Sequence, residues 1–156
     1  MTVSIPIANR VAIKYVVNGD TVSIISNGRV QKIDQKEKQR VLSEAVIFPE
    51  LEYGQKGYQT ALLGMQMTNG QQLYVVQVTS PSGEISKEYY DVASGLKTKQ
   101  EVLGDKSVLI TEYSNYKLVN GIKIPYTQTS NSFGQSIEMK LKEVKVNGGI
   151  DDSDFK

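Results

Sequence analysis

The chain has 156 residues, of which 39% are hydrophobic and 22% are charged, and its formal net charge is +1. This size and composition predict one globular domain that buries a core of its own. The sequence contains no histidine and no cysteine, which excludes serine and cysteine triads and the zinc, haem and iron–sulfur sites that use these ligands. The near-neutral charge argues against nucleic acid as a partner. Carboxylates, Lys, Tyr and Ser remain as possible catalytic groups, but no arrangement of them stands out in the sequence, so we expect no catalytic residue, no metal ligand and no cofactor.

Turn-forming pairs and triplets recur along the chain between runs rich in Val, Ile, Thr and Tyr. Asn-Gly supplies the positive φ that two-residue hairpin turns require, so the pattern predicts successive antiparallel hairpins in a meander. Helix-sized segments are missing between most of the runs, which argues against a parallel sheet. The turns are Asn18-Gly19-Asp20, Asn27-Gly28, Asn69-Gly70, Pro81-Ser82-Gly83, Ala93-Ser94-Gly95, Gly104-Asp105, Asn120-Gly121 and Ser132-Phe133-Gly134.

One segment, near residues 34–46, reads as a helix. Asp34 is a helix N-cap with a carboxylate, Glu37, three residues later, and Pro49 acts as a stop. The apolar face of this helix is expected to lie on the sheet. The apolar residues of this face and of the stretch that follows it are Val41, Leu42, Ala45, Val46 and Phe48.

Two strands alternate clearly between apolar and polar residues. In the run that ends at Thr68, Ala61, Leu63, Met65 and Met67 are expected on one face. Near the end of the chain the same holds for Ile137, Met139 and Leu141, after which the phase slips so that Val144 and Val146 carry the apolar face. A slip of one residue predicts a β-bulge, and bulged long strands indicate a curved sheet.

Domain boundaries follow from these elements. We expect a single domain over 1–156, with an N-terminal strand in 1–10, a meander over 11–146 that contains the helix, and a closing tail at 147–156. The fold class is mainly β (α+β): a curved antiparallel sheet with one short helix packed on its concave side.

Four stretches resemble the LolA/LolB-like lipoprotein-carrier superfamily, and more narrowly the carrier-like domain at the C-terminal end of insulinase-type zinc peptidases of Bacteroidetes-like bacteria. The resemblance covers about Val16 to Phe155, and it implies a half-barrel wrapped around a helix, whose concave face holds acyl chains or other hydrophobic ligands. In such a half-barrel the apolar helix residues named above are expected to form a cavity-plug helix. Family members begin with a helix and a strand that the first ten residues are too short to supply, so an N-terminal part is expected to be missing. The stretches are AVIFPEL (45–51), KEYYDVASGL (87–96), YSNYKLVNGIKIPY (113–126) and VNGGIDDSDF (146–155).

The residues of this resemblance also have a local structural reading. Asp91 can cap the turn that contains Ser94 and Gly95, and Pro125 places its strand on an edge or at a bulge. Carboxylate pairs suited to glycoside chemistry, such as Glu50 with Glu52 or Glu84 with Glu88, cannot be told from surface charge.

The candidate ligand surface is a set of apolar strand residues, for which packing in the core is the more ordinary alternative. They are Ala61, Leu63, Met65, Met67, Leu73, Val75, Ile137, Met139 and Leu141.

Two functions remain open at this stage. The first is a non-catalytic accessory domain of an insulinase-type zinc protease in the periplasm or cell envelope of a Gram-negative bacterium, with the rest of that peptidase as its partner. The alternative is a stand-alone periplasmic module that binds a lipid or acylated lipoprotein. An incomplete half-barrel also leaves strand edges near Val3, Ile5 and Ile7, which invite a homodimer.

Overall fold

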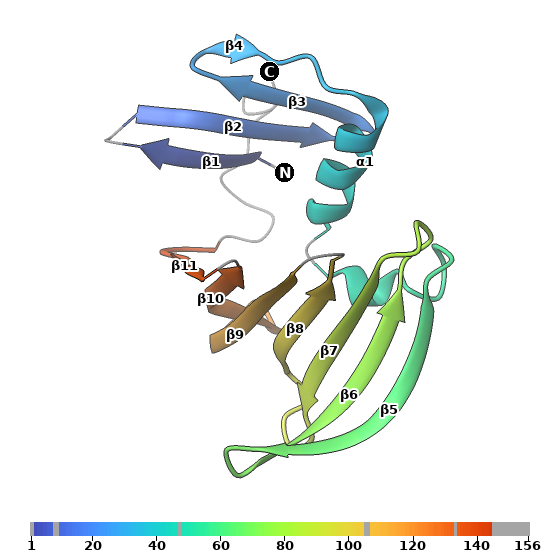
Figure 1. The fold of residues 1–156 in the computed structure, drawn as a ribbon. Coiled ribbons are helices and arrows are strands. Elements are labelled where there is room, and N and C mark those ends of the chain that lie inside the picture. The colour runs from blue at the N-terminus through green and yellow to red at the C-terminus, as the bar shows by residue number, and fades with distance from the viewer. Residues whose placement is uncertain (1, 8–9, 47, 105–106, 133, 145–156) are drawn as a thin grey trace. The chain divides into compact units, whose positions relative to one another are not determined.

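The computed structural model describes residues 2–7, 10–46, 48–104, 107–132 and 134–144, with side chains except at 2–7, 10–12, 36, 43–44 and 132 (Figure 1). The chain divides into two compact units, one ending at Leu51 and the other beginning at Glu52. We describe each unit by itself. The expectation of a mainly β, antiparallel fold with one short helix is confirmed.

The first unit is a four-stranded antiparallel sheet with one helix. Its strands follow chain order: β1 (Thr2–Ile7), β2 (Arg10–Asn18), β3 (Thr21–Ser26) and β4 (Arg29–Val30). The helix α1 (Gln35–Glu44) begins where predicted, because the Asp34 carboxylate accepts a hydrogen bond of 2.7 Å from the backbone N–H of Glu37. Val41 of α1 packs with Val17 and Ile24 of the sheet to form the core of this unit. A short 3₁₀ helix, η1 (Pro49–Leu51), ends the unit.

The second unit is a seven-stranded antiparallel meander in which every strand pairs with its neighbour in sequence. Figure 1 shows that β5, β6 and β7 bend along their length, so the predicted curved, open sheet is confirmed. The edges of the sheet are β5 and β11. The strands are β5 (Gln59–Thr68), β6 (Gln71–Thr79), β7 (Ile85–Asp91), β8 (Lys97–Leu103), β9 (Val108–Val119), β10 (Ile122–Ser132) and β11 (Gln135–Lys140).

The Asn-Gly turns have the predicted geometry. Asn69 and Gly70 have φ of 49° and 80°, and Asn120 and Gly121 have φ of 48° and 83°. Two successive positive φ angles define a type I′ turn, whose twist matches that of the flanking strands. The predicted Asp91 cap is also present, since its carboxylate accepts hydrogen bonds of 2.7 Å from the Ser94 backbone N–H and 2.6 Å from the Ser94 hydroxyl.

Two details of the predicted strands differ from the structure. The bulge expected after Leu141 is wrong, because β11 ends at Lys140 and residues 141–144 form no strand. Pro125 belongs to the interior strand β10, but β11 pairs with β10 only from Thr127 onward, so β9 alone lies beside Pro125 in the described ladders. The missing N–H of proline is tolerated at such a locally unpaired position.

The remaining expectations concern the ends of the chain. The strand β1 is an edge of the four-stranded sheet, as expected for Val3, Ile5 and Ile7. Residues 147–156, the predicted closing tail, lie outside the described residues. Among the residues that the structure describes, none forms a helix with the length and apolar character needed to cross a bilayer.

Candidate functional site

One row of paired residues crosses the seven-stranded sheet from edge to edge. Directly paired residues point to the same face of a sheet, so this row defines one face, which we call the Glu88 face. The opposite side, which carries Tyr89, is the Tyr89 face. The row runs Leu62, Val76, Glu88, Gln100, Thr111, Ser130 and Ile137.

The centre of the Glu88 face is a buried polar cluster. Glu88 is 0% exposed, and its carboxylate accepts hydrogen bonds from Tyr53 (2.8 Å), Lys97 (2.7 Å) and Gln100 (3.3 Å) on one oxygen. The Tyr90 hydroxyl donates to the other oxygen. A buried carboxylate is stable only when it is paired and fully hydrogen-bonded, and these donors meet that requirement.

A second layer of contacts fixes the donors in place. Tyr113 donates to Gln100 over 3.1 Å, and its ring lies 5.6 Å from the Lys97 ammonium. Tyr116 donates to the backbone carbonyl of Lys97 over 2.6 Å. Because Tyr53 precedes β5 in the chain and packs on Tyr58 with ring centroids 4.9 Å apart, the cluster also holds the segment before β5 on the Glu88 face.

Apolar side chains lie at both margins of the Glu88 face. Met65 pairs with Tyr74, which lies two residues before Val76 of the row. Met139 pairs with Gln128, which lies two residues before Ser130 of the row. Since residues two apart in a strand point to the same face, both methionines lie on the Glu88 face. Neighbouring apolar side chains that are exposed together are typical of an interaction surface, whereas single exposed ones are ordinary. Those on the edge strands, with exposed fractions from 53% to 69%, are Leu62, Met65, Met67, Ile137 and Met139.

The structure divides the predicted ligand surface between the two faces. A register shift between Leu62 and Gly64 forms a β-bulge around Leu63. It places Ala61, which pairs with Gln77, on the Tyr89 face, whereas Met65 lies on the Glu88 face. The expected alternation of Ala61, Leu63, Met65 and Met67 on one face is therefore wrong.

Four other predicted residues are sorted by the same registers. Leu73 and Val75 are buried with Tyr89 on the Tyr89 face. Ile137 and Met139 lie on the Glu88 face. Leu141 follows β11, and its backbone N–H donates to the Tyr126 carbonyl over 2.9 Å.

The Tyr89 face carries a charged cluster of its own beside its small core. Tyr89 donates to Glu101 over 2.9 Å, and Lys99 contacts Glu101 at 2.8 Å while its ammonium lies 3.9 Å from the centre of the Tyr89 ring. Burial, followed by the hydrogen bond to Glu101, raises the pKa of Tyr89 to about 12. Burial by itself raises the pKa of Glu101, but the hydrogen bonds from Lys99 and Tyr89 and the charges of Lys99 and Lys87 outweigh it, so the pKa of Glu101 is lowered.

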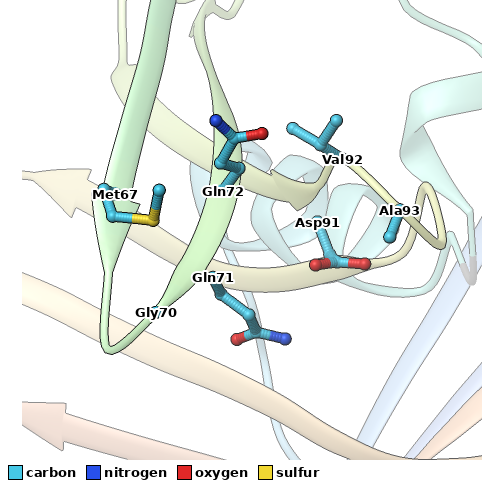
Figure 2. Close-up of a pocket in the computed structure, with 7 residues that line it drawn as sticks. All are labelled: Met67, Gly70, Gln71, Gln72, Asp91, Val92 and Ala93. Carbon is cyan, nitrogen blue, oxygen red and sulfur yellow. The ribbon is translucent and has the colours of Figure 1, made fainter.

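An open depression of about 380 Å³ lies where the β5–β6 hairpin meets the end of β7 (Figure 2). The Met67 side chain borders it, together with residues at the start of β6, at the end of β7 and in the turns beside them. The Asp91 carboxylate at its margin is engaged by Ser94. The depression thus lies next to the apolar margin at Met67. Of the predicted ligand residues, Met67 alone belongs to its lining. Its lining is Met67, Gly70, Gln71, Gln72, Asp91, Val92 and Ala93.

The predicted plug residues lie in the first unit. Val41 is buried in the core of that unit, and Leu42 and Ala45 pack around it, against the four-stranded sheet. Val46 and Phe48 follow the helix and are partly buried. This packing accounts for the apolar face of α1 within its own unit.

The Glu88 cluster was not predicted from the sequence. As a candidate catalytic group, Glu88 was paired with Glu84, whereas Glu88 is fully buried and Glu84 is exposed. A signal was present, because Ser86 and Tyr90 alternate with Glu88 in one strand and place a carboxylate in the middle of a half-buried face. Its donors, however, come from sequence positions as distant as Tyr53, 35 residues earlier, and Gln100, 12 residues later. Among the described residues, no group of histidine, cysteine or acidic side chains could hold a metal ion.

Comparison with solved structures finds the same fold in proteins of low sequence identity. A Vibrio parahaemolyticus domain described as that of an outer membrane lipoprotein-sorting protein has a TM-score of 0.66 and 18% identity, over 96% of this chain and 72% of its own. A DUF1329 family protein from Desulfovibrio piger gives 0.69 and 14% over 97% and 72%, and a LolA superfamily protein from Nitrosomonas europaea gives 0.57 and 13% over 90% and 70%. No family model and no curated protein matches the sequence. The chain therefore has a LolA-like fold.

Proposed function

We propose that this chain is a non-catalytic module that holds an acyl chain or a similar hydrophobic ligand on the Glu88 face. The observation that carries the proposal is the group of exposed apolar side chains on that face, Leu62, Met65 and Met67 on one edge strand and Ile137 and Met139 on the other. Unbranched methionine side chains adapt to flexible ligands. The fold shared with a domain described as lipoprotein-sorting supports the same ligand class.

The expected affinity follows from the area that the ligand can bury. Each methylene removed from water contributes about 0.8 kcal/mol, so about twelve methylenes yield roughly 10 kcal/mol. Association and ordering cost several kcal/mol of that sum. We therefore expect a dissociation constant in the micromolar range, which suits a module that takes up and releases its ligand.

The buried carboxylate supports a binding role rather than a catalytic one. Glu88 is 0% exposed, and its two oxygens accept hydrogen bonds from Tyr53, Tyr90, Lys97 and Gln100. A general acid or base must reach the substrate, and Glu88 is covered by its own donors. The cluster instead fixes the centre of the face between its apolar margins.

A titration with a dansyl-labelled fatty acid tests the binding proposal. We expect saturable enhancement of dansyl fluorescence with the wild-type chain. Met65→Lys and Met139→Lys should each weaken binding about tenfold, because a charge replaces an apolar contact worth at least about 1.5 kcal/mol.

Neighbouring residues of the same strands, on the opposite face, provide matched controls. Gln66→Lys and Glu138→Lys introduce a lysine beside each methionine but on the Tyr89 face, and both should bind like the wild type. Absence of saturable binding, or equal losses in the control variants, would contradict the proposal.

We further propose that the module works in the periplasm or envelope of a Gram-negative bacterium, as the C-terminal accessory domain of an insulinase-type peptidase. The support is the sequence resemblance over 16–155 together with the LolA-like fold. Antibodies raised against this chain and applied to envelope fractions should detect a polypeptide several times larger than 17.3 kDa. A band at 17.3 kDa alone would contradict the peptidase attachment and favour the stand-alone carrier.

A further inference from the structure

The seven-stranded sheet has one edge strand, β5, that carries neither charge nor proline. We propose that β5 is a self-association edge, at which two copies of this chain pair their β5 strands antiparallel about a two-fold axis at Gln66. The proposal concerns assembly and goes beyond ligand binding.

Comparison of the edge strands sets β5 apart. Natural sheets protect edges with proline, charge or very short strands. The strand β1 contains Pro6 and a register shift beside it, and β4 has only two residues, one of them Arg29. The six-residue β11 carries an exposed ion pair, Lys140 with Glu138 at 2.6 Å. By contrast, β5 has ten residues with no charge and no proline, and its bulge at Leu63 lies before the regularly paired segment from Gly64 to Thr68.

The side chains of β5 are also uncovered in the described part of the chain. Within those residues β5 pairs with β6 alone. Leu62, Leu63, Met65 and Met67 are each more than half exposed. A long, uncharged edge with exposed apolar side chains is an established site for pairing with another strand.

A second copy is the occupant that the charges and the register favour. Pairing about a two-fold axis brings residues of β5 against the same strand of the other copy, so charged residues near the axis would face like charges. Because β5 carries no charge, no like-charge repulsion opposes the pairing. From Gly64 to Thr68 the strand pairs regularly with β6, beyond the bulge. An axis at Gln66 pairs Met65 of one copy with Met67 of the other, and both lie on the Glu88 face.

The consequence is a sheet that continues across two copies. Antiparallel pairing about this axis keeps the Glu88 faces of both copies on the same side of the joined sheet. The apolar β5 margin of one copy then lies next to the apolar β5 margin of the other copy. Because the paired segment is short, the interface belongs to the small class, and we expect a concentration-dependent equilibrium.

Sedimentation of the whole chain, from about 2 to 200 µM, tests the proposal. The wild type should shift from 17.3 kDa toward twice that mass. Gln66→Lys places two lysines at the axis and should stay monomeric throughout. Ser136→Lys, an exposed residue on the opposite edge strand β11, is the matched control and should dimerise like the wild type.

Cysteine substitution tests the register, since the natural chain has none. Mild oxidation should link Gln66→Cys into a covalent dimer and leave Ser136→Cys largely unlinked. A wild type that stays monomeric over the whole range would overturn the proposal. So would a Gln66→Lys variant that still dimerises, or equal crosslinking at the two positions.

The dansyl titration on Gln66→Lys separates this proposal from the proposed function. A monomeric variant that binds the fatty acid supports both ideas. Binding by a wild type that never dimerises overturns only the dimer, and dimerisation without any binding overturns only the ligand proposal.

Discussion

The buried pair of Glu88 and Lys97 yields the sharpest stability prediction. Glu88→Gln keeps the shape of the side chain but removes its charge. The Lys97 side chain is 11% exposed, and its ammonium, 2.7 Å from the Glu88 carboxylate, then loses this counter-charge. Breaking a buried ion pair from one side costs about 3–5 kcal/mol. That is a large part of the roughly 5–15 kcal/mol that stabilises a domain.

Urea unfolding followed by circular dichroism and tyrosine fluorescence measures this cost. With a slope of about 1.5–2 kcal/mol per molar urea, the midpoint of the transition that reports the seven-stranded sheet should fall by roughly 2 M. Lys97→Met should be destabilising for the same reason. The double variant Glu88→Gln/Lys97→Met should cost less than the two single changes together, because it removes both members of the ion pair.

Tyr53→Phe is the companion variant for the same cluster. It removes a single hydrogen bond to the carboxylate, which is worth about 1.5–3 kcal/mol. If Glu88→Gln and Lys97→Met both unfold within about 0.5 kcal/mol of the wild type, the polar cluster does not stabilise the sheet and the reasoning fails.

Three further predictions concern local features. Asp34→Ala should lower the stability of the first unit by about 1 kcal/mol, because α1 loses its N-cap. Hydrogen exchange of the α1 amides should become faster in this variant. Asp34→Asn, which can still cap the helix, should keep most of the protection. Gly70→Ala should lower the free energy of unfolding by about 1–2 kcal/mol, since Gly70 has φ of 80°. The control Gly54→Ala, at a position with no positive φ and open space around the added Cβ, should stay within about 0.5 kcal/mol of the wild type. Urea unfolding measures both variants. The lowered pKa of Glu101 means that its contribution to stability is present above the ordinary value of 4.5 and is lost as the pH falls through the folded-state value. Thermal unfolding of Glu101→Gln should therefore depend less on pH below about 4.5 than that of the wild type, and parallel curves would contradict this account.

Features set by neighbouring residues could be predicted from the sequence. The Asn69-Gly70 and Asn120-Gly121 hairpins follow from residues that accept a positive φ. The start of α1 follows from a carboxylate three residues before the N–H that it caps. Strand order also followed, because a meander needs only local turns.

Features set by distant residues could not be predicted. Alternation alone placed Ala61 and Met65 on one face, but the bulge at Leu63 moves them to opposite faces, and pairing with β6 decides where the bulge forms. Likewise, the donors that make Glu88 a buried anchor include Tyr53, from 35 residues earlier in the chain. The division of the strands between two sheets also depends on pairing rather than on the pattern within one strand.

Native mass spectrometry of the chain, purified without organic solvent, tests the central claim most directly. A ligand on the Glu88 face predicts an adduct of a few hundred daltons that solvent extraction removes and added fatty acid restores. A bare chain mass of 17.3 kDa before extraction, with no adduct after addition of fatty acid, would contradict the account.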